Sequence, residues 1–222
     1  MREKVLISWS GGKDSAFALY EIIKTKQYEV AALLTTVTRD YDRISMHGVR
    51  TSLLEQQALS LGICLEKVFI TKDAANGDYE AQMKNTLLNY KKNGVESVVV
   101  GDIFLEDLRR YREDKLSEAG LKAIFPLWGK DTKKLADSFI NYGFKAALSC
   151  VDTKRLDKKF TGRLFSKGLV SELPEGVDHC GENGEFHSFV FDGPIFKEPV
   201  AFVKGEIVLR DDRFCYCDFL PL

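Results

Sequence analysis

The sequence contains no apolar run that approaches the roughly 20 residues needed to span a bilayer, and no secretory leader near its start. Its net charge of −1 provides no positive field, so we expect no nucleic-acid partner. The five cysteines are an odd number and include no Cys-x-x-Cys pair, which favours reduced thiols. These absences predict a cytoplasmic protein without a membrane segment.

Strand-like and helix-like patterns alternate through the first two thirds of the 222-residue chain. The strand patterns are apolar runs at residues 4–9, 29–37, 65–70, 95–102, 121–128 and 145–151. The helix patterns between them occupy residues 16–23, 52–62, 78–94, 104–120 and 131–143. Apolar strands joined by helices are typical of a parallel sheet that is covered on both faces. We therefore predict an α/β, Rossmann-like domain for residues 1–150.

The pattern changes after residue 151, where four of the five prolines occur and two strand-like runs, 185–191 and 200–209, have no clear helix between them. This composition predicts a smaller β-rich unit over residues 151–222. A unit of this size needs to pack against the first domain for stability. We expect it to contribute to substrate binding.

The most informative stretch is Ser10-Gly11-Gly12-Lys13-Asp14-Ser15, which lies between the first strand pattern and the first helix pattern. Two glycines let backbone N–H groups approach an anion closely, and the helix that follows offers its positive N-terminus. The Lys13 ammonium and the hydroxyls of Ser10 and Ser15 add further donors. The stretch matches neither Gly-x-x-x-x-Gly-Lys-Ser/Thr nor Gly-x-Gly-x-x-Gly. It predicts a phosphate-binding loop, and the alternative is a serine-capped turn.

The hexapeptide resembles the PP-loop of the N-type ATP pyrophosphatases, which split ATP between its α- and β-phosphates. This resemblance implies a five-stranded sheet in the order 3-2-1-4-5, with pyrophosphate on the loop. It also implies that adenine lies near the second strand pattern, where we expect Thr35 to contact the nucleotide. The loop alone does not choose among amide ligases, tRNA thiolases, sulfate reductases and synthetases.

Two further segments, 101–128 and 180–196, together with the residues just before the second, resemble the diphthine–ammonia ligase family. The matching positions are Gly101, Asp102, Ile103, Arg109, Glu113, Pro126, Leu127, Trp128, Gly162, Arg163, Gly181, Glu182, Gly184, Glu185, Phe186, Ser188, Asp192, Pro194 and Phe196. The resemblance covers essentially the whole chain. It implies an enzyme that adenylates a carboxylate with ATP and Mg²⁺ and amidates it with ammonium. The acceptor would be diphthine on elongation factor 2.

The nucleotide-binding residues expected from these motifs are the hexapeptide, Thr35, Gly101 and Arg109. Lys13 would neutralise charge on the departing pyrophosphate, and Asp14 and Asp102 would hold Mg²⁺. Asp14 has a second interpretation, as an acid that stabilises the first turn of a helix. For Arg109 the alternative is a solvated ion pair on a helix surface.

Glu182 and Glu185 are the candidates for binding ammonium or accepting its proton. The alternative for these two carboxylates is a tight turn of the small unit. His187 is expected to be a partly buried histidine with satisfied hydrogen bonds. With Lys13 and Asp102, the two glutamates complete the predicted catalytic set.

Three alternatives remain open at the level of sequence. The same chemistry could act on another carboxylate, and the charged segment Arg39–Arg50, which carries His47 and departs from the family pattern, is where we expect acceptor specificity to lie. A tRNA thiolase with a persulfide on Cys150 or Cys180 and a non-catalytic ATP sensor are the other two. The oligomeric state is also open, with a homodimer among the alternatives.

Overall fold

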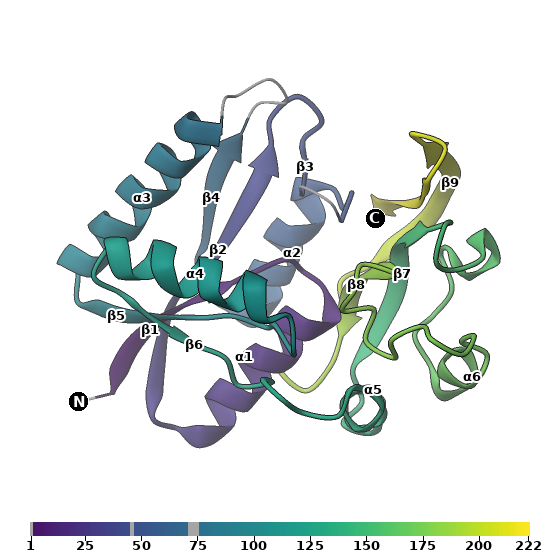
Figure 1. Ribbon diagram of the computed structural model, residues 1–222, viewed down its shortest axis with the longest axis horizontal. Coiled ribbons are helices and arrows are strands. Elements are labelled where there is room, and N and C mark those ends of the chain that lie inside the picture. The colour runs from purple at the N-terminus through teal and green to yellow at the C-terminus, as the bar shows by residue number, and fades with distance from the viewer. Residues whose placement is uncertain (1, 45–46, 71–75) are drawn as a thin grey trace.

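The computed structural model describes residues 2–44, 47–70 and 76–222, and its two sheets are drawn in Figure 1. Ser45 and Met46, in the segment expected to set acceptor specificity, lie outside the described residues. Among those described, no helix is both long and apolar enough to cross a membrane.

Five parallel strands form the main sheet in the spatial order β4, β2, β1, β5, β6. Their bounds are β1 (Glu3–Ser8), β2 (Tyr28–Thr38), β4 (Leu65–Ile70), β5 (Val95–Val99) and β6 (Lys122–Ile124). Counted along the chain as parallel strands, this is the order 3-2-1-4-5, so the predicted topology is confirmed. The short strand β3 (Arg43–Ile44) pairs antiparallel with the end of β2.

Helices cover both faces of this sheet, as the apolar strands predicted. They are α1 (Lys13–Thr25), α2 (Thr51–Leu61), α3 (Asn76–Lys92) and α4 (Glu106–Glu118), whereas α5 (Thr132–Asn141) lies beside the C-terminal unit. Alternate side chains of β1 reach opposite faces: Leu6 belongs to the core under α3 and α4, whereas Val5 and Ile7 belong to the core under α1 and α2. Because β1 is buried on both faces, the end of this strand is a rigid support for the loop that follows.

The second sheet is antiparallel, in the order β8-β7-β10-β9. It consists of β7 (Lys145–Asp152), β8 (Phe186–Asp192), β9 (Phe202–Arg210) and β10 (Phe214–Pro221), with a 3-10 helix at Lys158–Phe160 and α6 (Lys167–Ser171). The predicted β-rich unit is confirmed, but the assignment of residues 145–151 to the parallel sheet is wrong. An apolar strand buried on both faces has the same pattern in either kind of sheet. Residue 150 therefore lies inside a strand of the second sheet.

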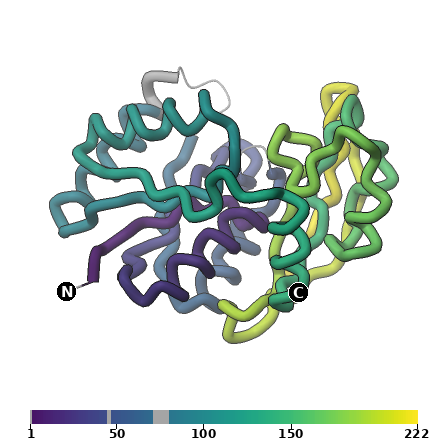
Figure 2. Tube along the Cα trace, turned by 60° about the horizontal axis from the view of Figure 1, so that its bottom comes forward, coloured from purple at the N-terminus to yellow at the C-terminus, as the bar shows by residue number. Residues whose placement is uncertain are grey.

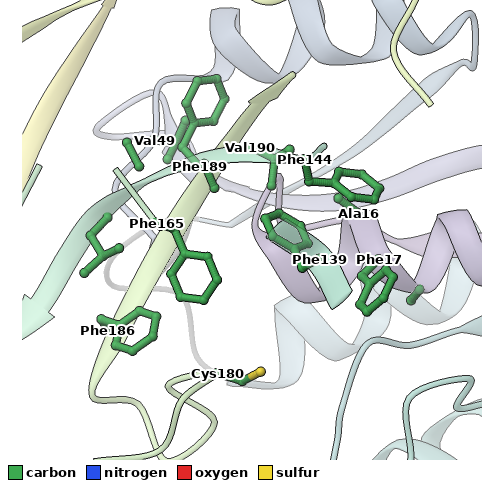
Figure 3. Close-up of a cluster of buried hydrophobic side chains, with 14 of the residues drawn as sticks. Ala16, Phe17, Val49, Phe139, Phe144, Phe165, Cys180, Phe186, Phe189 and Val190 are labelled. Atoms are coloured by element: carbon green, nitrogen blue, oxygen red, sulfur yellow. The ribbon is translucent and has the colours of Figure 1, made fainter. Parts of the chain in front are cut away.

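The two sheets share one core, and Figure 2 shows the second unit lying against one end of the first. Phe139 and Phe144 stack with ring centroids 4.7 Å apart, and Phe17 of α1 meets Phe139 edge to face. Phe165 extends the cluster toward Phe186 of β8, as Figure 3 shows. This continuous core places β8 beside the loop that follows β1.

Gln57 of α2 ties the units together at that point and is fully buried. Its Oε1 accepts a hydrogen bond from Trp9 Nε1 (3.0 Å), and its Nε2 donates to the carbonyls of Gly11 (3.0 Å) and Val190 (2.5 Å). The Val190 N–H also donates to the Gly11 carbonyl at 2.9 Å. The amide of one side chain therefore joins the loop, α2 and β8.

We expect Q57L to lower the free energy of unfolding by about 2–4 kcal/mol. The substitution leaves the buried indole N–H of Trp9 without an acceptor and removes one hydrogen bond from each of the buried carbonyls of Gly11 and Val190. Urea titration monitored by circular dichroism measures this change. The matched control is Q56L, one residue earlier and only partly buried, which should stay within about 0.5 kcal/mol of the unaltered protein. Equal stability of Q57L and Q56L would contradict the prediction.

Candidate active site

The loop Trp9–Gly12 leads from β1 into the N-terminus of α1. Gly11 has φ +71°, and a Cβ there would lie 2.8 Å from Gln57 Oε1, so both the conformation and the space favour glycine. Ser10 Oγ accepts from the Gly12 N–H at 3.3 Å and lies 3.1 Å from Ser15 Oγ. The predicted loop therefore forms, and serine hydroxyls fix its shape from within.

Lys13 is almost completely buried at the start of α1. Its ammonium donates to both carboxylate oxygens of Asp14 at 2.8 Å and to the carbonyl of Cys180. Burial opposes its charged form, but attraction to Asp14 outweighs this and raises the pKa of Lys13 above its usual value. The side chain is therefore a permanent cation next to the loop.

A second wall comes from the end of β5, where Gly101 packs against the start of α1. A Cβ on Gly101 would lie 2.8 Å from the backbone carbon and oxygen of Asp14. Asp102 follows, with a side chain only 12% exposed, and its Oδ2 accepts from Nε of Arg112 at 2.7 Å. Burial raises the pKa of Asp102 while Arg112 opposes that shift.

The third wall belongs to the C-terminal unit, between Gly181 and Ser188. Ser188 Oγ accepts from the backbone N–H of Lys13 at 3.1 Å, which joins β8 directly to the helix N-terminus. Glu182 reaches the other side and accepts from the backbone N–H of Ile103 at 2.7 Å. Segments more than 160 residues apart in the chain thus meet around Lys13.

These walls enclose a polar cavity of about 200 Å³. A larger and mainly apolar pocket of about 950 Å³ adjoins it, lined by strands β2 and β5 and helices α3 and α4. The two share six lining residues, namely Ser8, Ser10, His47, Val100, Arg112 and His187. Thr35 of β2 lines the larger pocket, and its buried hydroxyl has no hydrogen-bond partner among the described residues.

Two histidines stand at the border between the cavities. The rings of His47 and His187 are 4.4 Å apart. Burial, and then the neighbouring positive charge of Lys13, lower the pKa of His187 to about 4. Burial and His187 also lower the pKa of His47 well below its usual value. Both imidazoles are therefore neutral at pH 7.

Most of the residues predicted from the sequence do meet at the polar cavity: Ser10, Gly12, Lys13, Asp14, Ser15, Gly101, Asp102 and Glu182. Gly11 faces Gln57 instead. Glu185 is buried outside the cavity lining, and its Oε1 accepts from the Asp178 N–H (3.1 Å) and from Asn183 Nδ2 (3.0 Å). Arg109 stacks over Trp128, 4.6 Å from the ring centroid, and binds Glu113.

Sequence reasoning missed Arg112 and Gln57 and gave His187 no role at the cavity. Arg112 lies three residues after Arg109 on α4, and residues with this spacing are neighbours on a helix surface. This spacing was the signal that could have identified Arg112 as a site residue. No sequence pattern distinguishes a buried glutamine that joins distant segments by hydrogen bonds. The role of Gln57 was therefore not recognisable from the sequence.

Glu182 has a strongly shifted carboxylate, because burial raises its pKa from 4.5 to about 7, with Asp14 adding to the effect and the Ile103 N–H opposing it. A folded-state pKa above the unfolded value means that the folded state binds the proton more tightly. This contribution to stability is complete below pH 4.5 and is lost as the pH rises through about 7.

We therefore expect E182Q, which cannot titrate, to lose less stability than the unaltered protein between about pH 5 and pH 8. Chemical denaturation at a series of pH values measures the two slopes. E175Q, at an exposed position, should keep the slope of the unaltered protein. If E182Q kept it as well, Glu182 would not be the titrating group.

The fold and this site together define a nucleotide-binding α/β protein of the PP-loop class. Two family models match the chain, described as the diphthamide synthase N-terminal domain over residues 2–123 and the diphthamide synthase C-terminal domain over residues 131–218. The chain belongs to the diphthamide synthase family, whose curated relatives carry ligase names.

Three such relatives are named diphthine–ammonia ligase. The protein of Danio rerio is 29% identical over 234 residues, covering 95% of this chain and 91% of the relative. The Homo sapiens protein is 27% identical over 250 residues and covers 100% and 92%. The Schizosaccharomyces pombe protein is 29% identical over 236 residues and covers 96% of this chain but 38% of its own length. This chain thus spans well under half of the yeast protein.

Proposed function

We propose that this protein is an ATP-dependent ligase that activates a carboxylate as an adenylate and amidates it with ammonia, releasing AMP and pyrophosphate. The observation that carries the proposal is the spatial order of three features. The glycine loop with Lys13 borders a polar cavity, and this cavity adjoins an apolar pocket. ATP has the same order of groups, because its charged triphosphate matches the polar cavity and its adenosine matches the apolar pocket. The name shared by its relatives, diphthine–ammonia ligase, points to diphthine as the acceptor, which the family resemblance places on elongation factor 2.

In this arrangement the pyrophosphate portion of ATP lies on the loop, with Lys13 against its charge. Adenosine occupies the larger pocket, where Thr35 offers a hydroxyl without an internal partner. The α-phosphate then falls at the border of the two cavities, near His187 and Arg112. The carboxylate oxygen attacks at this border, so the reacting phosphorus is held between neutral imidazoles and a guanidinium.

Asp14 and Asp102 fit a magnesium site, because both line the polar cavity and Mg²⁺ is held by one or two carboxylates together with phosphate oxygens and water. Among the described residues, no group of three or more acidic, histidine or cysteine side chains is arranged to hold a metal. When bound, Mg²⁺ would neutralise phosphate charge. Lys13 and Arg112 keep the two carboxylates in place before it binds.

Glu182 is the carboxylate best positioned for the ammonia step, because it lines the polar cavity and has a pKa of about 7. It would hold ammonium and accept its proton, so that ammonia attacks the acyl carbon and AMP leaves. Glu185 supports the turn that carries Glu182, through Asn183 and the Asp178 N–H.

The state of the thiols supports an amide ligase over a tRNA thiolase. Burial raises the pKa of Cys180 and of Cys150 to about 12 in both cases. Both groups therefore remain protonated at neutral pH, whereas sulfur transfer needs a thiolate.

The test combines the protein with ATP, Mg²⁺ and ammonium, with and without diphthine-bearing elongation factor 2 whose carboxylate oxygens are labelled with ¹⁸O. We expect AMP and pyrophosphate to form with the factor present, and one labelled oxygen to appear in AMP. ADP and phosphate would contradict cleavage between the α- and β-phosphates. Bound ATP that never turns over would favour a nucleotide sensor.

A further inference from the structure

The segment Glu206–Arg210 forms the outer edge of the second sheet. β9 is the terminal strand of that sheet, and among the described strands it pairs with β10 alone. In Figure 1 it lies on the side of the molecule opposite the N-terminus. All five residues are exposed, including Ile207 (57%), Val208 (39%) and Leu209 (50%). An exposed apolar edge with unpaired backbone groups is a template for another strand.

The segment has defined limits at both ends. At its start, Gly205 and Glu206 together oppose Asp218, because the register shifts between the Lys204–Phe219 and Ile207–Cys217 pairs. This is a β-bulge, which bends an edge strand away from further pairing. After it, Asp211 and Asp212 make the hairpin turn with φ values of 52° and 48°. The pairing of β9 with β10 is thus regular from Ile207 to Arg210, and Glu206 is the second residue of the bulge.

The sequence of these residues, Glu-Ile-Val-Leu-Arg, is complementary to its own reverse. When two copies pair antiparallel about a two-fold axis at Val208, Glu206 of each lies opposite Arg210 of the other. Ile207 of each then lies opposite Leu209, and Val208 opposite Val208. Glu206, Val208 and Arg210 line one groove, so they share a face of the strand. Opposite charges and apolar pairs in direct cross-strand positions stabilise a sheet.

The charges are available for this purpose. Neither Glu206 nor Arg210 has an ion-pair partner in the part of the chain that the structure describes. A parallel pairing in register would place Glu206 opposite Glu206 and Arg210 opposite Arg210, which is unfavourable. An antiparallel contact with two-fold symmetry forms two equivalent Glu206–Arg210 pairs, so each charge of both copies faces an opposite charge.

We propose that β9 pairs with β9 of a second copy of this chain through Glu206–Arg210, which joins the two four-stranded sheets into one of eight strands. The contact is short, so the dimer is in rapid exchange with the monomer, as small interfaces are. This inference does not depend on the chemistry of the nucleotide site.

Sedimentation equilibrium of the full chain measures the association, with protein concentrations up to about 1 mM. We expect E206R alone, and R210E alone, each to weaken self-association on the order of tenfold or more, because both cross-strand pairs become like-charged. An equimolar mixture of E206R and R210E should associate as a heterodimer, because each altered strand then faces the opposite charges. Native mass spectrometry distinguishes the two variants by their mass.

The matched control is K204E, on the same strand but beyond the bulge, which should associate as the unaltered protein does. Circular dichroism checks that the exposed substitutions leave the fold intact. A protein that stays monomeric at the highest concentration would overturn the proposal. So would a dimer that both single variants leave unchanged, or a mixture that does not recover association.

Discussion

K13M is expected to reduce turnover of ATP by a factor on the order of 10²–10³ or more, the effect of removing one preorganised group from a site of developing charge. The Lys13 ammonium is buried and is held by Asp14 and the Cys180 carbonyl, so it costs no reorganisation when pyrophosphate leaves. Methionine keeps the volume of the side chain but removes its charge. Production of AMP at saturating ATP and acceptor measures the loss.

Two controls separate this effect from a loss of folding. K130M removes a lysine whose side chain is 41% exposed and paired with Glu21 at 3.1 Å, and it should leave turnover unchanged. A thermal melt of K13M checks that the fold survives the loss of the partner of Asp14. If folded K13M turned over ATP at the original rate, Lys13 would have no part in stabilising the leaving group.

G101A is the second substitution with a large expected effect. Its new methyl group would meet the backbone of Asp14 at 2.8 Å and the Ser15 nitrogen at 3.0 Å. Because a backbone cannot move aside as a flexible side chain does, we expect a loss of about 1–3 kcal/mol in the free energy of unfolding. Turnover should also fall, since relief of the clash separates the start of α1 from the end of β5 and widens the polar cavity.

Urea denaturation and AMP production together test this prediction. G168A is the matched control, because Gly168 lies within α6 and a Cβ there has its nearest neighbour at 3.8 Å. Alanine in a helix is favoured over glycine, so G168A should be as stable as the unaltered protein or slightly more stable. A G101A protein of unchanged stability would show that β5 and α1 can separate without cost.

Much of the first unit was predictable because its signals are local. Apolar runs of strand length separated by helix patterns specify a covered parallel sheet, and the glycine loop of residues 10–15 follows the first strand in the expected place. Asp102 was recognisable for a related reason, since the carboxyl ends of parallel strands meet at one edge of the sheet.

Other features could not be predicted because they depend on contacts between distant segments. The pattern of residues 145–151 is that of a doubly buried strand, but its neighbours in the second sheet come from residues 186–192 and 214–216. The choice between Arg109 and Arg112 depends on which side of α4 faces Asp102. Glu182 and Glu185 could not be told apart from the sequence, because both flank the same short turn. In the structure Glu182 lines the polar cavity, whereas Glu185 is buried beside Asn183.

The sequence by itself determined the covered parallel sheet and the position of the glycine loop, because strand periodicity and glycine conformation depend on neighbouring residues. The order of the parallel strands followed from the family resemblance that the motifs carry. Only the tertiary structure decided that β8 closes the site from the C-terminal unit, that two histidines meet between the cavities, and that Gln57 clamps the loop. Each of these depends on groups brought together from more than 40 residues apart. The physical reason is that burial and hydrogen-bond partners belong to the packed core, and they exist only once both sheets share it.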